Sequence, residues 1–161
     1  MLKIKKNGLT LVEILVAIAI VALLAAGLYS VSQYVDRQAK IKLTESTIAI
    51  LTAAIDEYHD FYKKFPALDD VYPSGCDSPI EKLYYRLGLA PDAKKILGHI
   101  NRSLIKNADG DDFPEVVDAW GKEFDYSYTG VENFPVITSA GPDGDFGETD
   151  PGKKEDNITS R

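Results

Sequence analysis

The hydrophobic pattern of this chain is dominated by one apolar run, residues 9–29. The run contains a single charge, Glu13, and it follows three lysines, Lys3, Lys5 and Lys6. About 20 apolar residues are enough for a helix to cross the hydrocarbon core of a bilayer. The run is too long for the apolar part of a cleaved signal peptide, and no small-residue cleavage site ends it. We therefore expect a transmembrane helix, with the lysines in the cytoplasm and everything after Tyr29 outside.

A second apolar pattern continues from this run as far as Lys64. Isoleucines and aromatic residues recur at every seventh position of an otherwise charged segment. They are Tyr34, Ile41, Ile48, Ile55 and Tyr62, with Leu51, Tyr58 and Phe65 at the alternate positions. One such stripe predicts a helix that lies on a globular domain. Because Pro66 disfavours helix at the residue before it, we expect this helix to end near Lys64.

The pattern after residue 64 predicts a small α+β head. Ser78, Pro79 and Glu81 have the spacing of a helix start with a capping box, and Gly88 is expected to end that helix. Short helical turns are expected between residues 92 and 105. Alternating aromatic residues predict a strand over 124–128, and a turn at Gly130 leads to a returning strand over 134–138. From Ser139 onward, glycine, proline and aspartate are too frequent for a regular element.

Glu13 stands out because it is a carboxylate inside an apolar helix. A charge at membrane depth is costly, and such residues usually have a function. Among Leu11, Val12, Ile14 and Leu15 we expect it to have no partner in its own sequence neighbourhood.

Residues 5–13, Lys-Lys-Asn-Gly-Leu-Thr-Leu-Val-Glu, resemble the cleavage site of type IV prepilins and type II secretion pseudopilins. The resemblance implies that a prepilin peptidase cuts after Gly8 and methylates the new N-terminus, Leu9, so that Glu13 becomes the fifth residue. It divides the chain into a leader (1–8), a transmembrane and filament-core helix (9–29) and a periplasmic head (30–161). It also implies an inner-membrane protein that is later extracted into a filament with copies of itself.

Two further segments are similar to the major pseudopilins. Residues 118–124, Asp-Ala-Trp-Gly-Lys-Glu-Phe, are close to an Asp-Pro-Trp-Gly-Asn-Pro-aromatic segment of that subfamily. The tail resembles its calcium-binding C-terminal loop, and the matching positions are Ser139, Asp143, Asp156 and Asn157. Asn157 stands where a second aspartate is usual. Calcium takes six to eight hard oxygen ligands, so the resemblance implies Ca²⁺ as a cofactor that orders the loop.

Charge and composition argue against several classes of function. The 161 residues carry a formal net charge of −7, and loss of the leader's three lysines lowers it to −10. So acidic a chain is not expected to bind nucleic acid, which requires a basic patch. Cys76 is the only cysteine, so no disulfide can form within the chain. His59 and His99 lie in no catalytic motif, so we expect no enzyme.

A second acidic segment, residues 107–115, is a further candidate for calcium binding. Asn107, Asp109 and Asp111 alternate as in calcium loops, but glycine occupies the fourth position where an EF-hand requires it at the sixth. We therefore interpret the segment as a solvated acidic turn.

The combined prediction is a structural subunit of a type II secretion pseudopilus or a type IV pilus-like filament. Its expected partners are further copies, minor pseudopilins or pilins, the prepilin peptidase and an inner-membrane assembly platform. Two alternatives stay open: a membrane-anchored binding domain that never assembles, and a secreted metal-dependent hydrolase that uses the acidic clusters.

Overall fold

The computed structural model describes residues 10–107, 110–130, 134–147 and 155–160, which form two compact units. The first unit is Met1–Ala39 and the second is Lys40–Arg161. The helix α1 (Leu11–Tyr62) contributes to both. Within the described residues, only α1 is long and apolar enough to cross a membrane. The expected α+β fold with a long N-terminal helix is confirmed.

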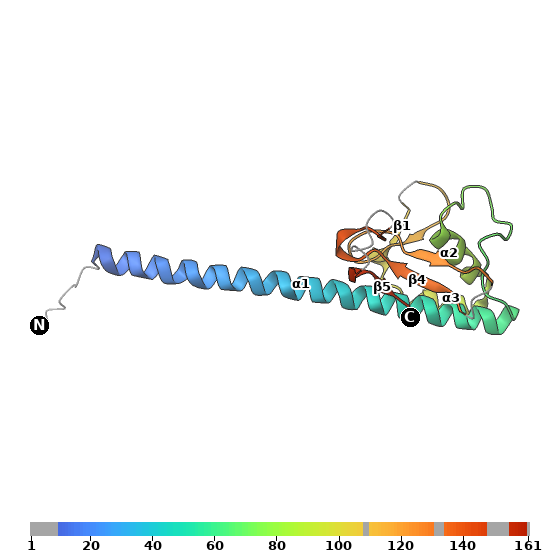
Figure 1. Cartoon of the computed structure of the whole chain (residues 1–161), viewed down its shortest axis with the longest axis horizontal. Coiled ribbons are helices and arrows are strands. Elements are labelled where there is room, and N and C mark those ends of the chain that lie inside the picture. The colour runs from blue at the N-terminus through green and yellow to red at the C-terminus, as the bar shows by residue number, and fades with distance from the viewer. Residues whose placement is uncertain (1–9, 108–109, 131–133, 148–154, 161) are drawn as a thin grey trace, which may run out of the picture. The chain divides into compact units, whose positions relative to one another are not determined.

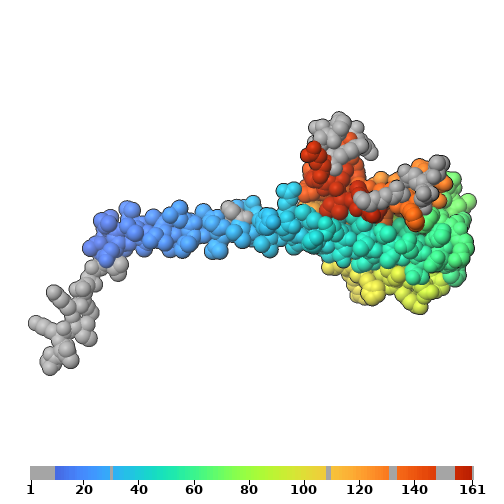
Figure 2. Space-filling model, turned by 60° about the horizontal axis from the view of Figure 1, so that its bottom comes forward, coloured from blue at the N-terminus to red at the C-terminus, as the bar shows by residue number. Residues whose placement is uncertain are grey.

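In the first unit, α1 is a bare apolar helix. Every described side chain from Leu11 to Ala39 is exposed, and Leu11 and Leu23 reach 79% and 75% exposure. Figure 2 shows this part of the helix in blue without covering segments. Such a surface is unfavourable in water and favourable in a bilayer or a bundle of helices.

In the second unit, α1 packs on the head through one face. The buried positions recur at spacings of three and four, which is the period of a helix face. They are Thr44, Thr47, Ile48, Leu51, Ala54, Ile55 and Tyr58. Figure 2 shows this part of α1, in cyan to green, along one face of the head. Ile48 and Ile55 of the predicted stripe are therefore buried, whereas Tyr34 and Tyr62 at its ends are 65% and 39% exposed.

The helix α1 ends two residues before the predicted position. Tyr62 is its last residue, and Lys63 takes a left-handed backbone conformation (φ 57°). The N–H of Lys63 donates to the carbonyl oxygen of His59 at 2.7 Å. This left-handed turn closes the helix before Pro66 can interfere with it.

Two shorter α-helices and a 3₁₀ turn come next in the chain. The helix α2 (Pro79–Leu89) has the predicted capping box: Ser78 accepts from the N–H of Glu81, whose carboxylate accepts from the N–H of Ser78. Gly88 lies inside the helix, which ends one residue later than predicted. The helix α3 (Pro91–Leu97) and the 3₁₀ turn η1 (Arg102–Leu104) supply the short helical turns expected between residues 92 and 105.

Two antiparallel sheets complete the head. The strands β1 (Ile105–Lys106) and β2 (Glu115–Val116) pair with each other. The second sheet has the order β3–β4–β5, formed by Asp125–Ser127, Val136–Ser139 and Ile158–Thr159. The predicted hairpin is β3 and β4, paired with Tyr126 opposite Ile137. The expectation that the tail forms no regular element was wrong, because β5 pairs with β4.

One hydrophobic core joins these elements. It lies between the C-terminal half of α1, the helices α2 and α3, and the strands. Its largest fully buried apolar and aromatic side chains are Leu51, Tyr58, Ile80, Leu83, Leu87, Val116, Phe124, Tyr126 and Ile137. The strand β5 lies beside α1 (Figure 1), and a cavity is lined by residues of both. Cys76 is buried.

Candidate functional site

The first candidate site is the start of α1, where Glu13 has a local partner. The carboxylate of Glu13 accepts from the backbone N–H of Thr10 at 2.8 Å and from its hydroxyl at 2.9 Å. The N–H of Glu13 in turn donates to the Thr10 hydroxyl oxygen at 3.2 Å. This is a capping box, and it corrects the expectation that Glu13 has no neighbouring partner. The spacing Thr-x-x-Glu could have revealed it in the sequence.

The capping box fixes where the carboxylate lies. Glu13 occupies the first turn of α1, where the helix dipole favours a negative charge. The side chain is exposed, so its charge is available to another molecule. Gly8 and Leu9 lie outside the described residues, and cleavage between them stays a prediction.

The second candidate site is the loop after β4, which begins at the 3₁₀ turn η2 (Gly141–Asp143). Gly141 has φ 69°, and a side chain there would collide with the carbonyl oxygen of Asp156. The loop and the segment before β5 are therefore in direct contact, although they are distant in sequence. This contact brings Asp156 and Asn157 to the loop that contains Asp143.

The amide of Asn157 lies beside three carbonyl oxygens of that loop. In one orientation its nitrogen donates to the carbonyl oxygen of Phe146 at 3.4 Å, and its oxygen faces those of Ala140 and Asp145. Turned over, the nitrogen donates to both of these at 3.2 Å. The second orientation satisfies the amide, whose hydrogen bonds then hold the segment before β5 against the loop. Carbonyl oxygens such as those of Ala140 and Asp145 are also ligands that calcium accepts.

The predicted carboxylates contribute unequally to this cluster of oxygens. One carboxylate oxygen of Asp156 is buried and has no hydrogen-bond partner among the residues that the structure describes, so those residues leave its burial uncompensated. Asp143 is exposed and accepts from the N–H of Asp145 at 2.8 Å. Within the described residues, no group of three or more His, Cys, Asp or Glu side chains could hold a metal ion. Any cation here would therefore depend largely on backbone and amide oxygens.

Ser139 is brought to the loop but has a different partner. It is fully buried, and its hydroxyl donates to Asp118 at 2.6 Å and accepts from the N–H of Gly141. Its side chain thus holds the start of the loop in place. The other carboxylate oxygen of Asp118 accepts from the N–H groups of Trp120 and Lys122.

Sequence reasoning missed Asp118 as the centre of this network. Asp118 is 1% exposed, and the neighbouring N–H of Ala119 donates to the Thr44 hydroxyl on α1. The network therefore connects the loop after β4 to the buried face of α1. The only signal in the sequence is an aspartate that opens a turn, a position where its side chain often caps backbone N–H groups.

Comparison with known proteins bears on the first site alone. Residues 3–29 match the prokaryotic N-terminal methylation motif, which supports a type IV pilin-like protein and includes Gly8, Leu9 and Glu13. No curated protein and no solved structure matches the chain.

Proposed function

We propose that this protein is a structural subunit of a pilus-like filament, either a type II secretion pseudopilus or a type IV pilus. The observation that carries the proposal is the N-terminal methylation motif at the start of a long, fully exposed apolar helix. The motif implies processing by a prepilin peptidase after Gly8. The exposed helix supplies a surface that a bilayer can cover before assembly and neighbouring helices can cover afterwards.

In this proposal Glu13 aligns each incoming subunit. Cleavage after Gly8 would create a positively charged, methylated amine on Leu9. The amine of one subunit would pair with the Glu13 carboxylate of its neighbour, and this pairing compensates two charges in an apolar bundle. Because the capping box with Thr10 holds the carboxylate at the helix start, Glu13 is oriented before the partner arrives.

The test compares variants at Gly8, Glu13 and Thr10 in the full-length chain. Gly8→Leu should accumulate uncleaved, as read by mass spectrometry of membranes. Glu13→Leu should be cleaved and inserted, yet be depleted from filaments collected by shearing. The control Thr10→Ala removes the two contacts of the Thr10 hydroxyl but retains the carboxylate and its backbone donor at residue 10, so it should assemble. Wild-type levels of Glu13→Leu in sheared filaments would contradict charge pairing, and cleavage of Gly8→Leu would contradict the processing site.

We also propose that the loop after β4 binds Ca²⁺. The proposal is supported by one carboxylate oxygen of Asp156, which is buried without a hydrogen-bond partner among the described residues, and by the nearby carbonyl oxygens of Ala140 and Asp145. Asp143, at the mouth of the same loop, would add a carboxylate, and Ser139 would hold the loop through Asp118. Bound calcium would neutralise these oxygens and order the loop on the surface of the head.

A further inference from the structure

The head has an apolar groove on the outer side of α2. Tyr84, Tyr85 and Leu89 of α2 form one wall, and Phe113 and Pro114 form the other. The groove has a volume of about 330 Å³, and its exposed lining is mainly apolar. Leu89 is 47% exposed and the Tyr85 and Phe113 rings are in edge contact, with centroids 5.8 Å apart. The groove is thus an aromatic-lined depression of the kind that receives a protruding apolar group.

Gly88 keeps this groove deep. It lies in the last turn of α2 without a left-handed backbone, so the helix itself does not require glycine there. A Cβ built on Gly88 would meet no atom within 4 Å. Alanine would favour the helix more at such a position. The space beside Gly88 is therefore left open by the protein's own side chains.

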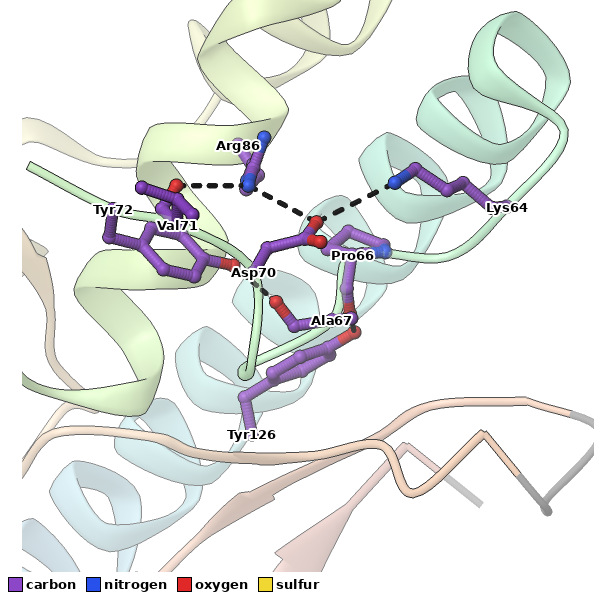
Figure 3. A network of polar contacts seen from close by, with 8 residues as sticks. All are labelled: Lys64, Pro66, Ala67, Asp70, Val71, Tyr72, Arg86 and Tyr126. Carbon is purple, nitrogen blue, oxygen red and sulfur yellow. Dashed lines mark hydrogen bonds and ion pairs between the residues drawn. The ribbon is translucent and has the colours of Figure 1, made fainter.

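A second surface of the same head presents an apolar side chain to solvent. Val71 is 92% exposed, the highest value among the exposed large hydrophobic residues. Its backbone is nevertheless held firmly, as Figure 3 shows: the Arg86 guanidinium donates to the Val71 carbonyl oxygen at 3.1 Å. Arg86 also pairs with Asp70 at 3.1 Å, and Lys64 approaches the same carboxylate at 3.6 Å.

Neighbouring contacts fix the segment on its other side. The Tyr72 hydroxyl donates to the Ala67 carbonyl oxygen at 2.5 Å, and the guanidinium of Arg86 lies 4.8 Å from the centre of the Tyr72 ring. The Arg86 side chain is 19% exposed and that of Asp70 is 28% exposed, so their pairing is partly shielded from water. The protein thus orders this segment while leaving its one large apolar side chain uncovered. Val71 does not line the groove of its own copy.

We propose that Val71 of one subunit inserts into the Tyr84–Tyr85–Leu89 groove of the next subunit. A second copy is favoured as the occupant because the proposed filament brings the heads of successive subunits together. The charged residues that line the groove are Lys94, Glu81 and Asp112. Asp69, exposed two residues before Val71, would approach Lys94. The contact joins two different surfaces, so it can repeat from copy to copy without closing. The inference rests on the proposed filament, because it names the contact that the heads make within it.

The test is disulfide cross-linking between full-length chains in cells. Val71→Cys and Leu89→Cys are placed on separate chains and produced together, so that only a contact between copies can link them. The native Cys76 is buried and serves as the background. Cross-linked dimers are expected when both chains are present and not when either is present alone. A single chain with both substitutions should give a ladder of multimers, whereas a closed two-fold contact would give dimers only and would overturn the repeating contact.

Further variants separate the contact from the fold. Gly88→Leu fills the groove from an unstrained helical position, so the melting temperature of the head should stay equal or rise. Introduced into the chain that carries Leu89→Cys, Gly88→Leu should lower the cross-linked fraction at least roughly tenfold, because its side chain occupies the space that Val71 would enter. For the charge pair, Asp69→Lys should weaken cross-linking and Lys94→Glu should restore it in the double variant.

The outcomes distinguish this contact from the proposed function. If filaments form at the wild-type level without cross-links between positions 71 and 89, the contact is wrong and the filament stands. If the wild-type chain forms no filaments, the proposed function is wrong, and cross-links are then scored in the membrane fraction. Their presence there supports self-association through the groove, and their absence overturns it.

Discussion

Tyr126 is the residue whose single hydroxyl fastens the end of α1 to the sheet. It is 1% exposed, and its hydroxyl donates at 2.6 Å to the carbonyl oxygen of Pro66 (Figure 3). The segment just after α1 is thereby tied to β3. Burial disfavours the charged phenolate and raises the pKa of Tyr126 far above its ordinary value of 10.0.

Tyr126→Phe should therefore change both the stability and its pH dependence. Removing the donor leaves the Pro66 carbonyl oxygen unpaired, which should lower the free energy of unfolding by about 1–3 kcal/mol at neutral pH. The folded pKa is raised, so the tyrosine's contribution is fully present below the unfolded pKa of about 10 and is lost as the pH rises above it. Urea unfolding at a series of pH values measures both effects.

The two proteins should differ in how steeply the free energy of unfolding falls with pH above about 10. Wild type should lose more stability than Tyr126→Phe as the pH rises above about 10. The variant keeps part of the slope, because burial also raises the pKa values of Tyr58, Tyr72 and Tyr84. Parallel slopes for the two proteins would show that the Tyr126 hydroxyl does not govern this loss.

Some residue roles could not be read from the sequence. Thr44 and Thr47 are polar, so the apolar stripe predicted from the sequence does not include them. Both are nevertheless buried. Thr47 satisfies its hydroxyl locally, at the carbonyl oxygen of Leu43, whereas Thr44 accepts from Ala119, 75 residues away. A partner at that distance depends on the fold, and no local pattern encodes it.

Among the elements, α2 was the most predictable because its start is determined locally. Ser78 and Glu81 complete a reciprocal cap within four residues, and Glu81 also accepts from the N–H of Asp77 at 2.8 Å. The strand β5 was the least predictable, since two residues carry no period. It forms by pairing with β4. Ser139 of β4, the partner of Ile158, lies nineteen residues earlier in the chain.

Loss of the α2 cap gives a direct test at this scale. Ser78→Ala should lower the free energy of unfolding by about 1 kcal/mol, because the N–H of Glu81 loses its acceptor. Ser74→Ala is the matched control: Ser74 is exposed in the preceding loop and should be neutral. Thermal or urea unfolding of the head provides the measurement. Equal effects of the two substitutions would mean that the capping contact contributes nothing.

At the scale of the whole molecule, the division into an apolar helix and a small α+β head followed from hydrophobic pattern alone. The hydrophobic pattern predicts which face of an element is buried. It did so correctly for residues 44–58, because the buried positions there recur at helical spacing. It could not predict which loops meet. The contact of Gly141 with Asp156, on which the proposed calcium site depends, arises only once β5 has paired with β4.

Calcium should stabilise the head as a whole if that loop binds it. Residues 30–161, which include the compact unit Lys40–Arg161, should gain about 2.7 kcal/mol at a hundredfold excess of calcium over the dissociation constant. Asp143→Ala and Asn157→Ala should each remove much of this gain, while Asp56→Ala, exposed on α1, should retain it. Equal melting temperatures in calcium and in chelator would rule out the site.

The single core also has a consequence for biosynthesis. Its α1 face, residues 44–58, is made first, and Ile137 of β4 follows Tyr58 after about 80 residues. At typical rates of synthesis this interval lasts roughly 4 to 16 s. For the part of that time before the first strands are made, Leu51, Ile55 and Tyr58 have no native partners from the strands. The yield of correctly folded protein should therefore respond to the speed of translation and export as strongly as to the free energy of unfolding.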